Sequence, residues 1–171
     1  MPRRELFTPA ERTELLAFPQ DEPGARESYL TERAMIDPSA SSNAVLLRKE
    51  MDFERAFVAA GGLLLSGPDP TGIGGVLPGY GDQRQVELLV EAGFSPIEAI
   101  RIATQNGARF LGREDDIGTL APGKRADLIL IKGDPAARIS DIENVDIVFK
   151  NGVGYDSHRL IESVRGQVGI R

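Results

Sequence analysis

The stretch Leu63-Leu64-Leu65-Ser66-Gly67-Pro68-Asp69 is a short apolar run that stops at a carboxylate placed between two prolines. Runs this apolar are typical of strands covered on both faces, as in parallel sheets and barrels, so we expect residues 63–65 to form a buried strand. Catalytic groups gather at the carboxyl ends of such strands, which makes Asp69 the first candidate for chemistry. Asp and Pro are also common turn formers, and the alternative is that Asp69 only caps a turn.

The overall composition is that of a globular domain, with 171 residues of which 41% are hydrophobic. No apolar run is long enough to span a bilayer and no signal peptide opens the sequence, so we expect a cytoplasmic protein with no membrane partner. The net charge of -6, without a basic block, argues against nucleic acid as a partner. The absence of cysteine excludes disulfides, thiolate metal sites and a cysteine nucleophile.

The chain contains one histidine, His158, so a metal site built from this chain alone has at most one imidazole. The neighbouring residues Asp156 and Ser157 suggest a catalytic triad at first sight. A triad needs side chains that converge from separately held elements, and three adjacent residues cannot place nucleophile, base and orienting group in line. We therefore expect His158 to be an exposed histidine near the C-terminus.

Capping and turn signals divide the chain into helices and strands. Thr8-Pro9-Ala10-Glu11 and Ser95-Pro96-Ile97-Glu98 are capping boxes with proline at the first helical position. Gly61-Gly62 stops the helix that precedes Leu63, and the loop from Gly67 to Gly81 has the length of a functional or mobile loop. The predicted helices cover residues 9–17, 44–60, 83–92, 95–104 and 106–111, and the predicted strands cover 126–131 and 145–150.

Four other polar residues have reactive side chains but fit structural roles better. Tyr80 and Arg84 flank the long loop, where they can touch a substrate, yet a surface tyrosine and a helix-face arginine are the more common outcomes. Lys124 follows Pro-Gly and is expected to be a turn residue, and Asp127 is expected to begin a strand.

Several linked motifs, taken in order and spacing, cover roughly residues 44–155. With them the chain resembles the C-terminal portion of the metal-dependent amidohydrolase superfamily, in its imidazolonepropionase-like and prolidase-like branch. The motifs are Ser66-Gly67-Pro68-Asp69, Leu77-Pro78-Gly79, the segment from Glu87 to Ile100 around Ala92-Gly93-Phe94-Ser95-Pro96, Ala103-Thr104-Gln105-Asn106-Gly107-Ala108-Arg109, Ile117-Gly118-Thr119-Leu120-Ala121-Pro122-Gly123-Lys124-Arg125-Ala126-Asp127-Leu128, and Val148-Phe149-Lys150-Asn151-Gly152.

The resemblance implies an α/β fold, in which the last βα units of a (β/α)8 barrel precede strands of a small β-sandwich. Residues 63–66 then correspond to the eighth barrel strand. Asp69 falls on the family's aspartate, which touches the metal and serves as general base toward the attacking water. The implied organisation is an N-terminal segment with a short helix at 1–43, barrel units at 44–112, sandwich strands at 113–155 and a tail at 156–171.

Two departures from the family pattern limit what this chain does alone. Gly67-Pro68-Asp69 replaces the familiar Gly-Thr-Asp, and the family's other ligands, a His-x-His pair, a bridging lysine or glutamate and two further histidines, have no source in this sequence. A catalytic zinc site needs about three protein ligands, so Asp69 cannot hold the metal by itself. We therefore expect the chain alone to be inactive. A divalent metal, zinc by its preference for nitrogen and oxygen ligands, would bind only with histidines from another chain.

Three functional hypotheses remain. The favoured one is the C-terminal part of a hydrolase that acts on amide or cyclic C–N bonds in small molecules or dipeptides and requires an N-terminal amidohydrolase segment as its partner. The second is a noncatalytic binding or regulatory module, in which a homo-oligomer covers exposed strand edges. The third is a nucleotide binder that uses Gly72, Gly74 and Gly75, although the P-loop lysine is missing.

Overall fold

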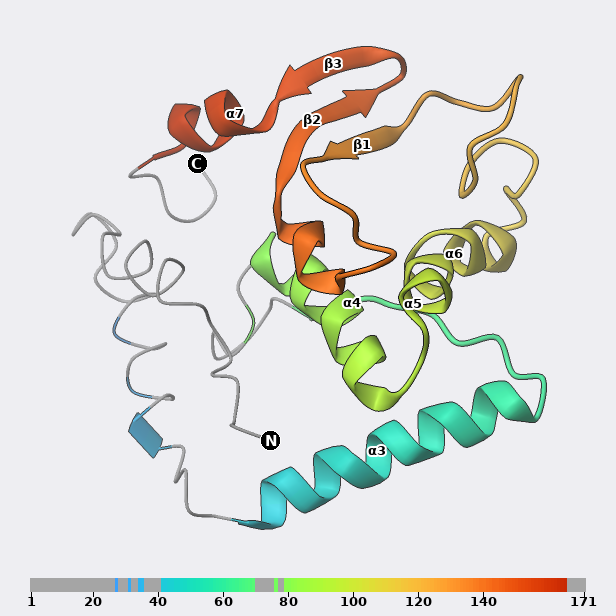
Figure 1. Cartoon of the computed structure of the whole chain (residues 1–171), viewed down its shortest axis with the longest axis vertical. Helices are drawn as coiled ribbons and strands as arrows, with labels where there is room; N and C mark the ends of the chain where they lie inside the picture. The colour runs from blue at the N-terminus through green and yellow to red at the C-terminus, as the bar shows by residue number, and fades with distance from the viewer. Residues whose placement is uncertain are drawn as a thin grey trace.

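The structure is a computed structural model that describes residues 27, 31, 34, 35, 41–69, 76 and 79–165. Helices and a small sheet make up the described part, which confirms the α/β composition expected from the sequence (Figure 1). The helices are α3 (Ser41–Ala59), α4 (Tyr80–Ala92), α5 (Pro96–Ala103), α6 (Gln105–Phe110) and α7 (Ser157–Ser163), with a short 3-10 helix η1 (Ile139–Glu143). The strands are β1 (Leu128–Ile131), β2 (Val145–Lys150) and β3 (Val153–Asp156).

The boundary between α4 and α5 shows how local sequence sets the helix ends. Gly93 ends α4 in the left-handed conformation, with a φ of 110°. Two residues later the Ser95 hydroxyl accepts from the Glu98 amide, and the Glu98 carboxylate accepts from the Ser95 amide at 2.8 Å. Pro96 occupies the first turn. The predicted capping box is therefore confirmed, and each predicted helix from residue 44 onward is present with ends shifted by a few residues.

The three strands form an antiparallel sheet in the order β1-β2-β3. β2 and β3 are joined by Asn151 and Gly152, whose φ angles of 51° and 80° are those of a two-residue hairpin turn. The sequence predicted β2 with its observed bounds and placed β1 two residues too early, while β3 was not predicted. Adding β3 explains how two otherwise marginal strands become a stable sheet.

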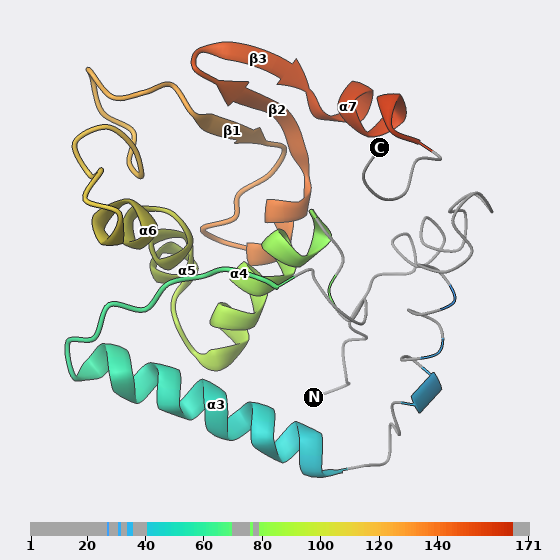
Figure 2. The ribbon, with the colours of Figure 1, turned by 180° about the vertical axis from the view of Figure 1, so that it is seen from behind.

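A shared hydrophobic core joins the helices to the sheet end of the molecule. Ala99 on α5 is completely buried, and Ile142 on η1 packs with the helical residues, so η1 connects the sheet to the helices. Figures 1 and 2 show from opposite sides that α3 lies beyond α4 and α5, away from the sheet. The buried hydrophobic residues are Met51, Val86, Leu89, Ala92, Phe94, Ala99, Ile102, Ala108 and Ile142.

The predicted strand at residues 63–65 is wrong for this structure. Residues 62–69 form an irregular connection, and Leu65 is 37% exposed. A strand exists only when a neighbouring segment completes its hydrogen-bond ladder, and the described strands pair only with one another. The C-terminal region also differs from the expected tail, because Ser157–Ser163 forms α7.

Some expectations fall on residues outside the described ranges. These are the helix at 9–17 and the glycine cluster of Gly72, Gly74 and Gly75. Among the helices that the structure does describe, none combines the length and the apolar character that crossing a bilayer requires.

Candidate functional site

Asp69 ends the irregular connection that leaves α3, and its side chain is exposed. Upstream of it, Leu64 is half-buried against the hydrophobic core. The Leu64 carbonyl accepts a hydrogen bond from the Asn106 side-chain amide on α6, with 2.8 Å between Nδ2 and the oxygen. This contact bridges 42 positions of sequence and fixes the connection to the helical layer.

Immediately before Asp69, Pro68 lies beside the first turn of α4. A Cβ placed on Gly81 would come within 3.5 Å of the Pro68 Cβ and 2.6 Å of Val76 Cγ1. Because Gly81 has no side chain, Pro68 and Val76 of the 67–81 loop region can both approach the helix closely. Pro68, the residue before Asp69, therefore lies against the first turn of α4.

The side of α4 carries a charged cluster. Arg84 Nη1 lies 2.9 Å from Glu87 Oε2 and 2.8 Å from Glu91 Oε1. Burial disfavours the charged guanidinium, but the hydrogen bonds and charges of Glu91 and Glu87 outweigh it and raise the pKa of Arg84. Arg84 is thus engaged within its own helix, as the helix-face interpretation predicted.

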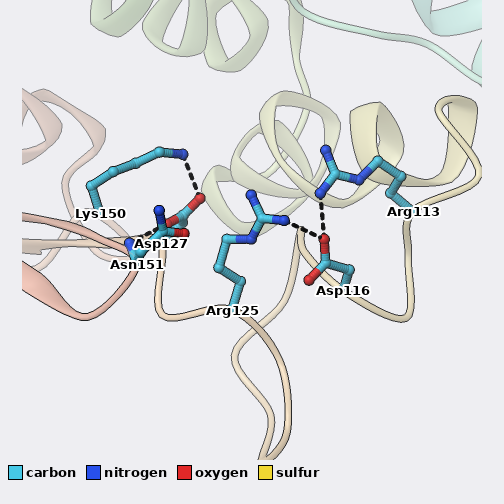
Figure 3. A network of polar contacts seen from close by, with 6 residues as sticks. All are labelled: Arg113, Asp116, Arg125, Asp127, Lys150 and Asn151. Atoms are coloured by element: carbon cyan, nitrogen blue, oxygen red, sulfur yellow. Dashed lines mark hydrogen bonds and ion pairs between the residues drawn. The ribbon is translucent and has the colours of Figure 1, made fainter.

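The loop between α6 and β1 is organised by a chain of polar contacts, shown in Figure 3. Asp116 accepts from Arg113 and, at 2.9 Å, from Arg125. The Arg113 hydrogen bond, with the charges of Arg125 and Arg113, lowers the pKa of Asp116. Lys124 donates to the Glu114 carbonyl and the Thr119 hydroxyl, which makes it a loop residue, as predicted.

Asp127 joins the start of β1 to the β2–β3 hairpin (Figure 3). Its carboxylate accepts from the Asn151 amide at 2.7 Å and from Lys150 Nζ at 2.6 Å. These two hydrogen bonds, the backbone one first, lower the pKa of Asp127. The strand-start role expected for Asp127 is confirmed.

The adjacent Asp156, Ser157 and His158 do not form a triad. The Asp156 carboxylate caps α7 by accepting from the Arg159 amide at 3.0 Å, and the Ser157 hydroxyl donates to the Val145 carbonyl on β2. His158 lies on the exposed surface of α7. The first two side chains hold α7 to the sheet, so the sequence-based rejection of a triad is confirmed.

No group of three or more histidine, cysteine, aspartate or glutamate side chains suited to a metal ion occurs within the described ranges. Asp69 alone therefore does not fit a catalytic divalent metal, which needs about three protein ligands. The contact that sequence reasoning missed is the one made by Asn106. Its available signal was weak, because an asparagine within a helix is only mildly unfavourable and is common near helix ends.

Residues 79–154, from the start of α4 to β3, match the protein-family model of the amidohydrolase family. This match covers 76 of the 171 residues and makes the described helices and sheet similar to amidohydrolases. The resemblance stated from the sequence motifs is therefore confirmed. Asp69 precedes the matched residues, so its assignment depends on the Ser-Gly-Pro-Asp motif.

Curated relatives match short stretches of this chain. An adenine deaminase from Roseobacter denitrificans is 39% identical over 79 residues, which is 46% of this chain and 12% of that protein. Adenine deaminase 3 from Rhizobium meliloti is 49% identical over 47 residues, which is 28% of this chain and 8% of that protein. The chain thus spans about a tenth of the length of these relatives.

Solved structures give longer matches. A putative prolidase from Bifidobacterium longum superposes with a TM-score of 0.54 at 36% identity, covering 59% of this chain and 25% of that one. Phenylurea hydrolase B superposes with a TM-score of 0.53 at 26% identity, covering 68% of this chain and 28% of that one. The described fold is therefore a recognisable quarter of larger amidohydrolase-like chains.

Proposed function

We propose that this chain is the C-terminal part of a metal-dependent hydrolase that cleaves amide or cyclic-amide C–N bonds in small molecules or dipeptides. The observation that carries the proposal is the family match over residues 79–154. It is supported by the likeness to a putative prolidase, a phenylurea hydrolase and adenine deaminases, whose names all denote reactions at C–N bonds. In this proposal residues 44–112 supply the last units of a (β/α)8 barrel and 113–155 supply sandwich strands.

Asp69 is the proposed catalytic carboxylate and the metal ligand of this chain. In the assembled site it takes a proton from the attacking water, the water oxygen bonds to the carbonyl carbon, and the proton passes to the leaving nitrogen as the C–N bond breaks. A bound divalent metal, zinc by preference, would lower the pKa of the water that it binds. Asp69 is an exposed residue of the described segment.

The remaining metal ligands are proposed to come from an N-terminal amidohydrolase segment carried by another chain. The one histidine of the sequence lies on α7, and there is no cysteine, so this chain offers no nitrogen or sulfur set of its own near Asp69. Residues 63–65, which pair with none of the described strands, would gain strand partners when such a segment completes the barrel.

Exposed hydrophobic surface supports the need for a partner. On α3, Phe53 is 70% exposed and its ring stacks on Phe57, with 6.5 Å between the ring centres. On the sheet, Ile129 and Leu130 of β1 remain exposed. Apolar side chains on two separate elements are typical of surfaces that another segment covers.

A noncatalytic module is the second candidate, favoured by the shortage of metal-ligating side chains. In that case the amidohydrolase architecture serves binding, and a second copy of the chain covers the exposed surfaces. The two candidates differ in whether anything depends on the Asp69 carboxylate.

Native mass spectrometry and metal analysis of the purified protein test the proposal. We expect a complex with a histidine-rich companion and bound metal, and loss of amide hydrolysis by about a hundredfold or more in Asp69→Asn. Asp115→Asn is the matched control, because Asp115 is an exposed aspartate in the loop between α6 and β1. A metal-free homo-oligomer whose properties are unchanged in Asp69→Asn would support the noncatalytic module instead.

A further inference from the structure

We propose that Asn106 and Gly81 are positioning residues for the Asp69 carboxylate. The inference rests on the proposed function, which gives Asp69 its chemical role. Asn106 fixes the segment at Leu64, and Gly81 gives Pro68 its place beside α4. Neither residue is argued to touch the substrate.

The Asn106 contact matters because residues 62–69 have no sheet ladder to hold them. A backbone carbonyl that leaves water needs a donor, and the Asn106 amide supplies one to Leu64 at 2.8 Å. The donor comes from α6. The Thr104 hydroxyl, which lies between α5 and α6, donates to the Ile100 carbonyl on α5 and so joins the two helices. The segment is therefore tied to the helical layer by a residue far along the sequence, in addition to the Gly62 amide that donates to the Phe57 carbonyl of α3 at 2.9 Å.

The backbone between this tie and Asp69 is stiff at its far end. Pro68 has a fixed φ, and Pro70 restricts Asp69 to extended conformations because of the clash between a proline ring and the residue before it. These two prolines limit the backbone on either side of Asp69, so a shift of Pro68 displaces the Asp69 backbone with it.

Gly81 places Pro68. It lies in the first turn of α4, where glycine is a poor helix former, yet an alanine Cβ would meet Val76 Cγ1 at 2.6 Å. A larger side chain at position 81 would collide with Pro68, because only 3.5 Å separates the Gly81 Cβ position from the Pro68 Cβ. Gly107 on α6 is the matched control, because a Cβ there meets no atom within 4 Å.

Spin labelling tests the positioning directly, since the chain has no native cysteine. Nitroxides at Asp69→Cys and at the exposed Arg101→Cys on α5 report the position of residue 69 relative to the helices. We expect a narrow distance distribution that broadens in Asn106→Ala and shifts in Gly81→Leu. Gln105→Ala and Gly107→Ala should leave it unchanged. A reference pair at Arg101→Cys and Ala136→Cys should stay narrow in every variant, which separates local release from general unfolding.

Activity provides the second measurement, made on the assembly with its companion. Because a displacement of about 1 Å at a reacting group costs about a hundredfold in rate, Asn106→Ala should lower kcat by that order with little change in KM. A 69–101 distribution that does not respond to Asn106→Ala overturns the inference. If the distribution responds but hydrolysis is indifferent to Asp69→Asn, the proposed function fails while the anchoring of the segment stands.

Discussion

Asp141 at the sheet end of the molecule and the segment that leads to Asp69 differ in how far along the sequence their hydrogen-bond partners lie. In the sheet end, the buried Asp141 carboxylate accepts from the Asp134 amide at 2.9 Å and from Arg138 Nε at 2.7 Å, all within one connection between β1 and β2. The Asp69 segment is held instead by Asn106, far away in sequence. The comparison indicates that the β1–β2 connection satisfies the Asp141 carboxylate locally, whereas the proposed catalytic segment depends on contacts from other elements.

The helical core that both regions share should give the largest effect. Leu89 on α4 is 5% exposed, and Leu89→Ala should lower the free energy of unfolding by about 2–5 kcal/mol. Ile97→Ala, at a position 51% exposed on α5, should change it by no more than about 0.5 kcal/mol. Urea unfolding of the two variants measures the difference, and equal losses would show that the helices do not form a common core.

The locally satisfied region can be broken at Gly133. Its φ is 128°, and an added Cβ would lie 2.4 Å from the Asp141 carboxylate. Gly123→Ala is the matched control, because Gly123 also has a positive φ of 86° but has open space around it. We expect a loss of about 1–2 kcal/mol in Gly123→Ala from backbone strain and about 1–3 kcal/mol more in Gly133→Ala. Thermal unfolding that does not separate the two variants would argue against the Asp141 clamp.

Two helical glycines sharpen the comparison at the other end. Gly107→Ala should raise stability by about 0.5–1 kcal/mol, because alanine suits a helix better and the site is open. Gly81→Ala should show no such gain, because its Cβ conflicts with Val76. A matching gain at both sites, measured by urea unfolding, would mean that the loop gives way without cost.

Acid should affect Asp141 at the sheet end and Glu54 on α3 with opposite sign. Hydrogen bonds from the Asp134 amide and then Arg138 lower the pKa of Asp141, so its contribution is present above its unfolded pKa and is lost as the pH falls through the folded pKa. On α3, burial and then the charge of Glu50 raise the pKa of Glu54, so its ionisation costs stability as the pH rises. We expect Asp141→Asn to lower the urea midpoint at pH 7 but not in acid. Glu54→Gln should raise the free energy of unfolding slightly at pH 7, by less than about 0.5 kcal/mol.

The smallest effect on the isolated chain is expected at the exposed surface of α3. Phe53→Ser should change its stability by no more than about 0.5 kcal/mol, since Phe53 is 70% exposed. In native mass spectrometry the same variant should weaken the proposed complex with the companion chain. Undiminished association would place the partner surface elsewhere.

Much of the local structure could be predicted because its causes lie within a few residues. The Ser95 capping box depends on neighbouring side chains and backbone angles, and it was predicted correctly. The strand-start role of Asp127 followed from the turn chemistry around it. The third strand was missed because Val153–Asp156 is short and its pairing depends on β2.

The sequence alone determined the helices between residues 44 and 111, the strands β1 and β2, the amidohydrolase resemblance and the choice of Asp69 as the candidate carboxylate. Only the tertiary structure decided that Leu63, Leu64 and Leu65 form no strand in this chain. It also decided that a hydrogen bond from Asn106, and no strand pairing, holds this segment. The reason is physical: a cap is satisfied within one helical turn, whereas a strand or a side-chain tie needs a partner that the fold brings from far along the sequence.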